Sequence, residues 1–165
     1  MQIVRRIATM KAFQYSTMHR TNTPLTQARK RHGPMSYARL EAEARRLNVE
    51  ITCHKHGPKG AWIPHLKRVS IREDLIGGGA VSTLAHELGH AHFRHPAGHS
   101  PRNELAADRW AARALIDADE YRELERLFPG EDFLISQELG VTRHLLGIWR
   151  RHEAWRCAPQ LLDVF

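Results

Sequence analysis

Three residues in the middle of the chain have the types and the spacing of a metal-dependent hydrolytic site. His86, Glu87 and His90 follow the order H-E-x-x-H within the stretch STLAHELGHAHFRH. On a helix, residues four apart lie about 40° apart around the axis and about 6 Å apart along it, so two imidazoles can face one ion. The glutamate beside them can act as a general base. The motif therefore predicts a zinc site, which needs a third protein ligand.

The residues after the motif predict that third ligand. A turn, PAGHSP, is followed by NELAADRWAARALI, a pattern typical of a second helix. If this helix folds back antiparallel on the first, Glu104 lies beside His90 and Asp108 lies beside His86. Glu104 is then the predicted carboxylate ligand. Asp108 is predicted to accept the outer N–H of His86 and to hold that ring in its ligating tautomer.

Three further histidines close to the motif are weaker candidates. The extended metzincin pattern H-E-x-x-H-x-x-G-x-x-H would need glycine and histidine where the chain has Phe93 and Pro96. His95 stands one residue too early for that pattern. We therefore interpret His95, together with His92 and His99, as a polar residue of the surface or a loop. The alternative is a contact to a ligand histidine or to the substrate.

If a zinc ion is held by His86, His90 and Glu104, the expected reaction is hydrolysis of an amide bond. Zinc lowers the pKa of its bound water towards about 7 and polarises the scissile carbonyl. Glu87 is expected to take the proton of that water and to deliver it to the leaving amine. The spacing does not identify the group that stabilises the oxyanion, and a His or Tyr from outside the helix pair is the expected source.

The stretch GAWIPHLKRVSIRED before the motif contains two β-type runs, at residues 61–63 and 68–71. They predict a hairpin or a meander. Pro64 cannot donate to a sheet ladder, so the first of these strands should lie at an edge. An edge strand can pair with an extended peptide. The predicted substrate-binding residues are therefore Ala61, Trp62 and Ile63.

Other segments have the periodicity of helices and of one more strand. An amphipathic helix is predicted from residue 36, followed by a strand at VEITC. The triple glycine at residues 77–79 is expected to break the chain before a motif helix over 80–93. Further helices are predicted over residues 118–127, 132–138 and 142–155.

Length and composition favour one soluble domain. A chain of 165 residues is long enough to bury one hydrophobic core without disulfides or a structural metal. Its two cysteines, Cys53 and Cys157, fit a reducing compartment better than a disulfide framework. No apolar run approaches the roughly 18 residues of a membrane span, and MQIVRRIATMKAF lacks the apolar core of a secretory signal. We therefore expect a cytoplasmic protein that does not enter a membrane.

The formal net charge of +7 is concentrated at the N-terminus. Residues 1–40 hold eight Lys or Arg and no Asp or Glu. We predict a basic, disordered N-terminal arm over residues 1–34. Its charge favours a contact with nucleic acid, and a solvated tail is the alternative.

The motif and the helix after it resemble the ImmA/IrrE family of small bacterial and phage metallopeptidases. That family pairs H-E-x-x-H with a downstream E-x-x-A-(N/D)-x-F-A, and Trp110 here replaces the usual Phe. The strand pair in GAWIPHLKRVSIRED is also similar, and the resemblance extends from about residue 35 to 155. We predict a peptidase domain over residues 35–157 and a tail over 158–165. The residues that match the downstream motif are Glu104, Ala107, Asp108 and Ala111.

This resemblance implies a fold and a regulatory role. The fold would be α+β and zincin-like, of the gluzincin type. A small three-stranded, mostly antiparallel sheet would pack on the H-E-x-x-H helix and the following ligand helix, with further C-terminal helices. Family members cleave, or promote the cleavage of, helix-turn-helix repressors of phages, mobile elements or stress genes. The implied partner is therefore a DNA-binding repressor, whereas the residues themselves predict only a zinc peptidase.

Two other segments allow a second interpretation. LISQELGVTRHLLGIWRRH resembles a helix-turn-helix, but a pair of helices that closes the core is favoured, because a third helix is not visible. Its core residues would be Leu145, Leu146, Ile148 and Trp149. TCHKH has metal-compatible residues without a partner cluster, so the end of a strand is favoured there.

Two other functions also remain open. A non-catalytic antirepressor, or a module that binds DNA or repressor through the basic arm and the C-terminal helices, is the alternative to a peptidase. A SprT-like protease of DNA-bound proteins is the third possibility. The third zinc ligand of such proteases is normally histidine, so Glu104 argues against it.

Overall fold

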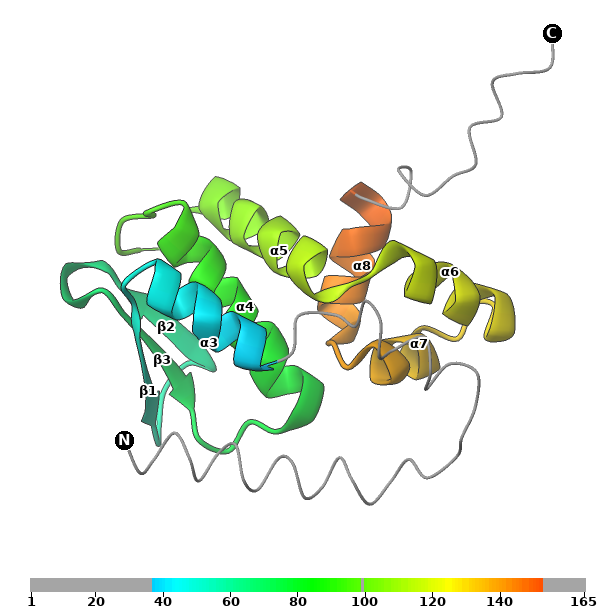
Figure 1. Ribbon diagram of the computed structural model, residues 1–165, viewed down its shortest axis with the longest axis horizontal. Helices are drawn as coiled ribbons and strands as arrows, with labels where there is room; N and C mark the ends of the chain where they lie inside the picture. Colours follow the sequence, from blue (N-terminus) through cyan, green and yellow to red (C-terminus); the bar gives the residue numbers. More distant parts are fainter. Residues whose placement is uncertain (1–36, 99, 153–165) are drawn as a thin grey trace, which may run out of the picture.

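The computed structural model describes residues 37–98 and 100–152 (Figure 1). The predicted basic arm and tail, His99 and Cys157 lie outside these ranges. Within them the chain is α+β, with six α-helices, one short 3-10 helix and three strands. In chain order these are α3 (Tyr37–Arg46), β1 (Glu50–His54), β2 (Gly60–Ile63), η1 (Pro64–Leu66), β3 (Arg68–Arg72), α4 (Gly77–His92), α5 (Pro101–Leu115), α6 (Ala118–Leu127), α7 (Asp132–Leu139) and α8 (Arg143–His152).

The three strands form a mixed sheet in the order β1-β3-β2. β2 and β3 are antiparallel, with Trp62 opposite Val69, as the predicted hairpin requires. β1 and β3 are parallel, with Ile51 also opposite Val69. The expectation of a mostly antiparallel sheet is therefore wrong. β2 pairs with β3 alone among the described strands, so its predicted place at the edge is confirmed.

The connections explain the mixed pairing. β2 and β3 are joined by η1 and by Lys67, whose φ of 46° is left-handed, and this tight reversal makes the pair antiparallel. The chain crosses over β3 between β1 and β2, which places β3 in the middle. Val69 on this central strand is fully buried. A local pattern of alternating residues predicts strands but not which non-consecutive strands become neighbours.

The glycines before the motif belong to a helix, contrary to the predicted break. α4 begins at Gly77, whose φ of +52° is left-handed and so suits glycine. The helix ends at His92. Gly78 is required by a close approach, because a Cβ atom there would lie 2.9 Å from the backbone carbonyl of Gly140. The first turn of α4 is therefore a docking point for the segment between α7 and α8.

α4 is the central helix of the molecule. It packs against β2 and β3 on one side and against α5 on the other, while α3 covers α4 and β1 (Figure 1). The core is built on this helix and extends into the C-terminal helices. Its fully buried larger side chains include Leu40, Val69, Leu84, Leu88, Leu115, Leu124, Ile135, Leu145 and Leu146.

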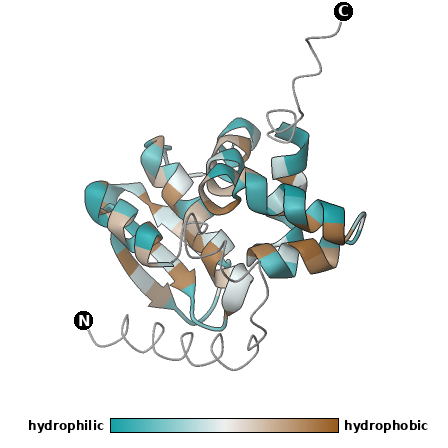
Figure 2. Cartoon of the chain, turned by 45° about the vertical axis from the view of Figure 1, so that its right-hand side comes forward, coloured by the Kyte–Doolittle hydropathy of each residue, from teal (hydrophilic) through white to brown (hydrophobic). Residues whose placement is uncertain are grey.

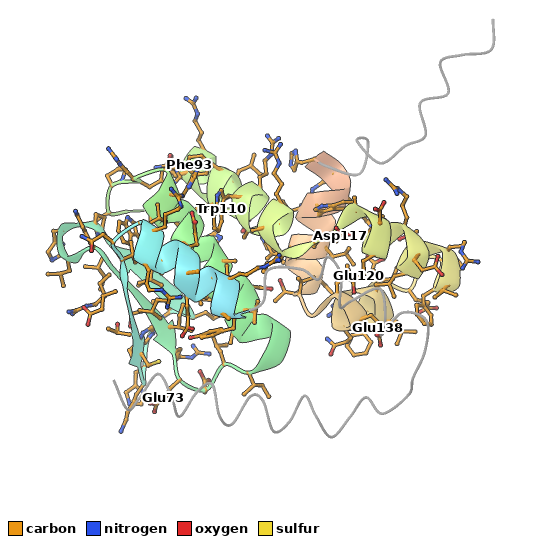
Figure 3. The ribbon with its side chains drawn as sticks, in the orientation of Figure 1. Glu73, Phe93, Trp110, Asp117, Glu120 and Glu138 are labelled. Carbon is orange, nitrogen blue, oxygen red and sulfur yellow. The ribbon has the colours of Figure 1, made fainter. Side chains whose placement is uncertain are left out.

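The C-terminal helices close the core, as the favoured interpretation of this segment predicted. Leu145, Leu146, Ile148 and Trp149 of α8 are all buried. α6 is mostly hydrophilic along its sequence, whereas half of the residues of α7 are hydrophobic (Figure 2). α6 begins at the cap residue Asp117 (Figure 3), whose carboxylate accepts the N–H groups of residues 119 and 120.

Arg150 joins these helices through polar contacts. Its guanidinium donates to the Tyr121 hydroxyl at 2.9 Å and to the Glu125 carboxylate at 2.7 Å, and it also bonds Asp132. These partners raise the pKa of Arg150 despite the opposing effect of burial. One arginine of the segment that resembles a helix-turn-helix is thus engaged within the domain.

Charges in the described part of the chain are nearly balanced. Residues 37–98 and 100–152 hold 17 Lys or Arg and 16 Asp or Glu. The excess of positive charge therefore belongs to residues 1–36, which hold seven Lys or Arg and no Asp or Glu. Among these residues, no helix has the length and apolar character needed to cross a membrane.

Candidate metal centre

α4 carries the H-E-x-x-H motif in its C-terminal half. His86 and His90 are one turn apart, and their ring centroids lie 4.8 Å apart. Leu84 and Leu88, which project to the other side of the helix, are fully buried. Core packing therefore fixes the rotation of α4 that presents both imidazoles to α5.

α5 supplies the predicted third donor, the candidate ligand Glu104. The helices run antiparallel, so that Glu104 in the first turn of α5 meets the last turns of α4. Its Oε2 lies 3.3 Å from Nε2 of His86 and 3.6 Å from Nε2 of His90. The two Nε2 atoms are 3.1 Å apart. Among the described residues, these three side chains form the group that could hold a metal ion.

The size of this donor triangle fits a four-coordinate ion. Nitrogen and oxygen atoms about 2.0–2.1 Å from a tetrahedral ion lie about 3.3 Å from one another. The three observed separations of 3.1, 3.3 and 3.6 Å scatter around that value. A metal ion here would also offset the repulsion between three electron-rich donor atoms at these separations.

Asp108 holds the outer side of His86, as predicted. Its Oδ1 lies 2.8 Å from Nδ1 of His86, so Nδ1 donates and Nε2 presents its lone pair to the donor triangle. Burial tends to lower the pKa of His86, but Asp108, Glu87 and Glu104 together raise it above its ordinary value. Burial and the neighbouring His86 lower the pKa of His90. The neighbouring carboxylates thus favour positive charge at His86, beside the space that a metal ion would take.

His95 has a structural role that differs from the favoured interpretation. Its Nδ1 lies 2.9 Å from Nδ1 of His90, and its backbone carbonyl accepts the indole N–H of Trp62 at 3.0 Å. The favoured interpretation of His95 as a polar residue of the surface or a loop is therefore incomplete. The alternative, a contact to a ligand histidine, matches the observed contact with His90. The chain turns back immediately after α4, with the His95 N–H bonded to the His90 carbonyl, and this turn brings the ring within reach.

His92 and Trp110 lie at the same end of the helix pair. The His92 ring is 5.0 Å from the Phe93 ring and 5.5 Å from the Trp110 ring, and Figure 3 labels these two aromatic residues at that end. Trp110 packs against the core. It places an aromatic side chain beside His92 of α4.

Glu87 is buried beside the edge strand. It is 8% exposed, and a Cβ atom on Gly60 of β2 would lie 2.7 Å from its Oε1. Gly60 therefore lets the strand backbone approach the carboxylate directly. In β2, Ala61, Trp62 and Ile63 are all half-buried. The predicted substrate strand thus lies against the motif helix, and the Trp62 indole is engaged by the loop that carries His95.

The metal-compatible residues of TCHKH lie apart from this site. His54 ends β1, where its ring bonds the Ser70 hydroxyl at 2.7 Å and the Pro58 carbonyl at 2.8 Å. The favoured interpretation as a strand end is confirmed.

His144 was not predicted from the sequence but contacts the candidate metal centre, because its Nε2 lies 2.7 Å from Oδ2 of Asp108. No spacing rule relates residues 36 positions apart on different helices.

Gly89 allows the two ligand helices to approach closely. A Cβ atom there would lie 2.9 Å from the Ala107 carbonyl oxygen and 3.0 Å from its Cα. Gly89→Ala should lower the free energy of unfolding by about 1–3 kcal/mol through overpacking, although alanine favours the helix by about 1 kcal/mol. Urea unfolding measures this change. Gly79→Ala in the same helix, where a Cβ meets nothing within 4 Å, is the matched control. Equal midpoints for the two variants would contradict the close approach.

No protein-family model matches the chain, and the search of curated proteins gives no significant match.

Proposed function

We propose that the chain is a zinc-dependent endopeptidase that hydrolyses a peptide bond in a regulatory protein, a helix-turn-helix repressor of a phage or mobile element. The observation that carries the proposal is the donor triangle of His86, His90 and Glu104 with the buried Glu87 beside it. Three protein ligands are typical of catalytic zinc, which keeps its fourth position for water or substrate.

Two imidazoles and one carboxylate suit zinc among the common divalent ions. Magnesium and calcium prefer sets of oxygen ligands, whereas the nitrogen-rich set here matches zinc sites of hydrolases. Outer partners strengthen this assignment: Asp108 orients His86, and His95 orients His90. Each ligand histidine therefore has its second ring nitrogen engaged, an arrangement that zinc histidines almost always have.

Glu87 is the general base of the proposed reaction. A zinc ion bound here would lower the pKa of a bound water towards about 7 and polarise the carbonyl that is attacked. Glu87 accepts the proton of the attacking water and delivers it to the departing amine. Its burial between α4 and Gly60 keeps the carboxylate in one place and limits access of bulk water to it.

The edge strand β2 is the proposed platform for the substrate. Its pairing with β3 uses one side of the strand, and an extended peptide can add to the other side through main-chain hydrogen bonds. Ala61, Trp62 and Ile63 would lie along that peptide. Because Gly60 abuts Glu87, a peptide on this edge passes close to the general base.

The regulatory substrate is proposed from the resemblance to the ImmA/IrrE family. Support comes from the placement of Glu104 and Asp108, since both positions of that family's downstream motif face the H-E-x-x-H histidines. A carboxylate third ligand also favours this assignment over a SprT-like protease, which normally uses histidine.

The test is cleavage of a candidate repressor by the purified chain. The zinc content is measured first, and the protein is then incubated with the helix-turn-helix repressor encoded beside it. We expect about one zinc per chain and cleavage at a single site, which mass spectrometry of the fragments locates. A chelator should stop cleavage and added zinc should restore it. A zinc-loaded chain that leaves both this repressor and an unfolded general substrate intact would contradict the proposal.

A further inference from the structure

We infer that His144 of α8 is a positioning residue of the metal centre, which acts on His86 through Asp108. The inference rests on the proposed metal site and adds a residue outside both ligand helices. It assigns to α8 a role beyond closing the core. The C-terminal helix would hold in place the carboxylate that orients one of the ligands.

The contacts form one continuous chain of side chains. Nε2 of His144 lies 2.7 Å from Oδ2 of Asp108, and Oδ1 of Asp108 lies 2.8 Å from Nδ1 of His86. Asp108 thus uses one oxygen for each imidazole. The terminal torsion of an aspartate is broad and nearly two-fold, so a carboxylate held through one oxygen can rotate. A second donor on the other oxygen removes that freedom and fixes the plane of the carboxylate against His86.

The exposure of the three side chains distinguishes a positioning role for His144 from a role in the folded core. The Asp108 side chain is 13% exposed and that of His86 is 21% exposed, whereas that of His144 is 64% exposed. His144 therefore contributes little to the buried core, and its replacement should leave the fold intact. Its geometric effect is concentrated on the single carboxylate that it contacts.

Independent contacts set the place of α8 on α4. The backbone of Gly140 and Val141 approaches Gly78, where a Cβ would be only 2.9 Å away. The Thr142 N–H then donates to the Ser82 hydroxyl at 3.0 Å. These contacts anchor the start of α8 one turn of α4 before His86. His144 follows two residues later, so its reach to Asp108 is a consequence of the register between the two helices.

The first experiment measures metal affinity, which does not depend on any substrate. Zinc affinity is determined by chelator competition for the wild type, His144→Ala and His144→Gln. Arg143→Gln, at the neighbouring exposed position, is the control. Loss of an outer partner typically weakens metal affinity about 10–100-fold. Because His144 acts one step further out, we expect about tenfold weaker binding for His144→Ala. Gln, which keeps an N–H donor, should retain most of the affinity, and the control should match the wild type.

A double-mutant cycle distinguishes positioning from a general structural effect. Asp108→Ala/His144→Ala should bind zinc no more weakly than Asp108→Ala alone, because His144 has no carboxylate left to hold. Additive losses, or equal affinities for His144→Ala and the control, would overturn the role of His144 while the metal site stands. A wild-type chain that binds no zinc would overturn the metal site and this inference together. Circular dichroism verifies that each variant is folded.

Discussion

We expect Glu87→Gln to abolish the proposed hydrolysis while zinc binding and the fold are retained. The amide has nearly the shape of the carboxylate, so the buried space between α4 and Gly60 stays filled. It cannot accept a proton, and general-base catalysis typically contributes about 10²–10⁴-fold to the rate. We therefore expect kcat/KM on the repressor to fall by at least about a hundredfold. Zinc content and the unfolding midpoint should stay close to those of the wild type.

Glu73→Gln is the matched control for this change. Glu73 is exposed just after β3 and lies at the far end of the sheet in Figure 3. Its variant should cleave the repressor at the wild-type rate. If Glu87→Gln still inactivates the repressor without cutting it, the antirepressor alternative gains direct support. If it cuts at the wild-type rate, Glu87 is not the base.

The grouping of the three candidate metal ligands could be predicted from sequence because their spacing is local. The period of a helix places His86 beside His90, and an antiparallel return after a short turn places Glu104 and Asp108 opposite them. For these residues to meet, the two helices must also pack closely, and Gly89 makes this close packing possible. For these residues the three-dimensional arrangement follows from periodicity and from one chain reversal.

The rest of the arrangement depends on contacts that no local pattern encodes. Parallel pairing of β1 with β3 is decided by which strand fills the centre of the sheet, and the hairpin alone leaves this open. His144 reaches Asp108 because α8 docks on the first turn of α4, in a segment whose glycines suggested a break. His95 is near the motif in sequence, but the turn that folds it onto His90 follows no ligand spacing rule.

Glu104→Ala is expected to remove metal binding and therefore activity. The change removes one of the three donors, because the lost carboxylate is the group whose Oε2 lies 3.3 Å from His86 Nε2 and 3.6 Å from His90 Nε2. Two histidines alone do not complete a catalytic zinc site, which typically has three protein ligands. Loss of an outer partner alone weakens affinity by about 10–100-fold, so loss of a ligand should exceed about a hundredfold. Cleavage of the repressor should fall to the level seen with a chelator.

Zinc-dependent stability gives a readout that needs no substrate. An ion that binds only the folded chain stabilises it by about 2.7 kcal/mol at a concentration a hundred times its Kd. The wild type and Arg102→Ala, an exposed change in the same turn of α5, should show this gain. Glu104→Ala should show almost none. Without metal, Glu104→Ala should be as stable as the wild type. The Glu104 side chain is 33% exposed, so its removal opens no cavity in the core. An equal zinc-induced gain in all three proteins would place the ion elsewhere and remove the basis for hydrolysis at this centre.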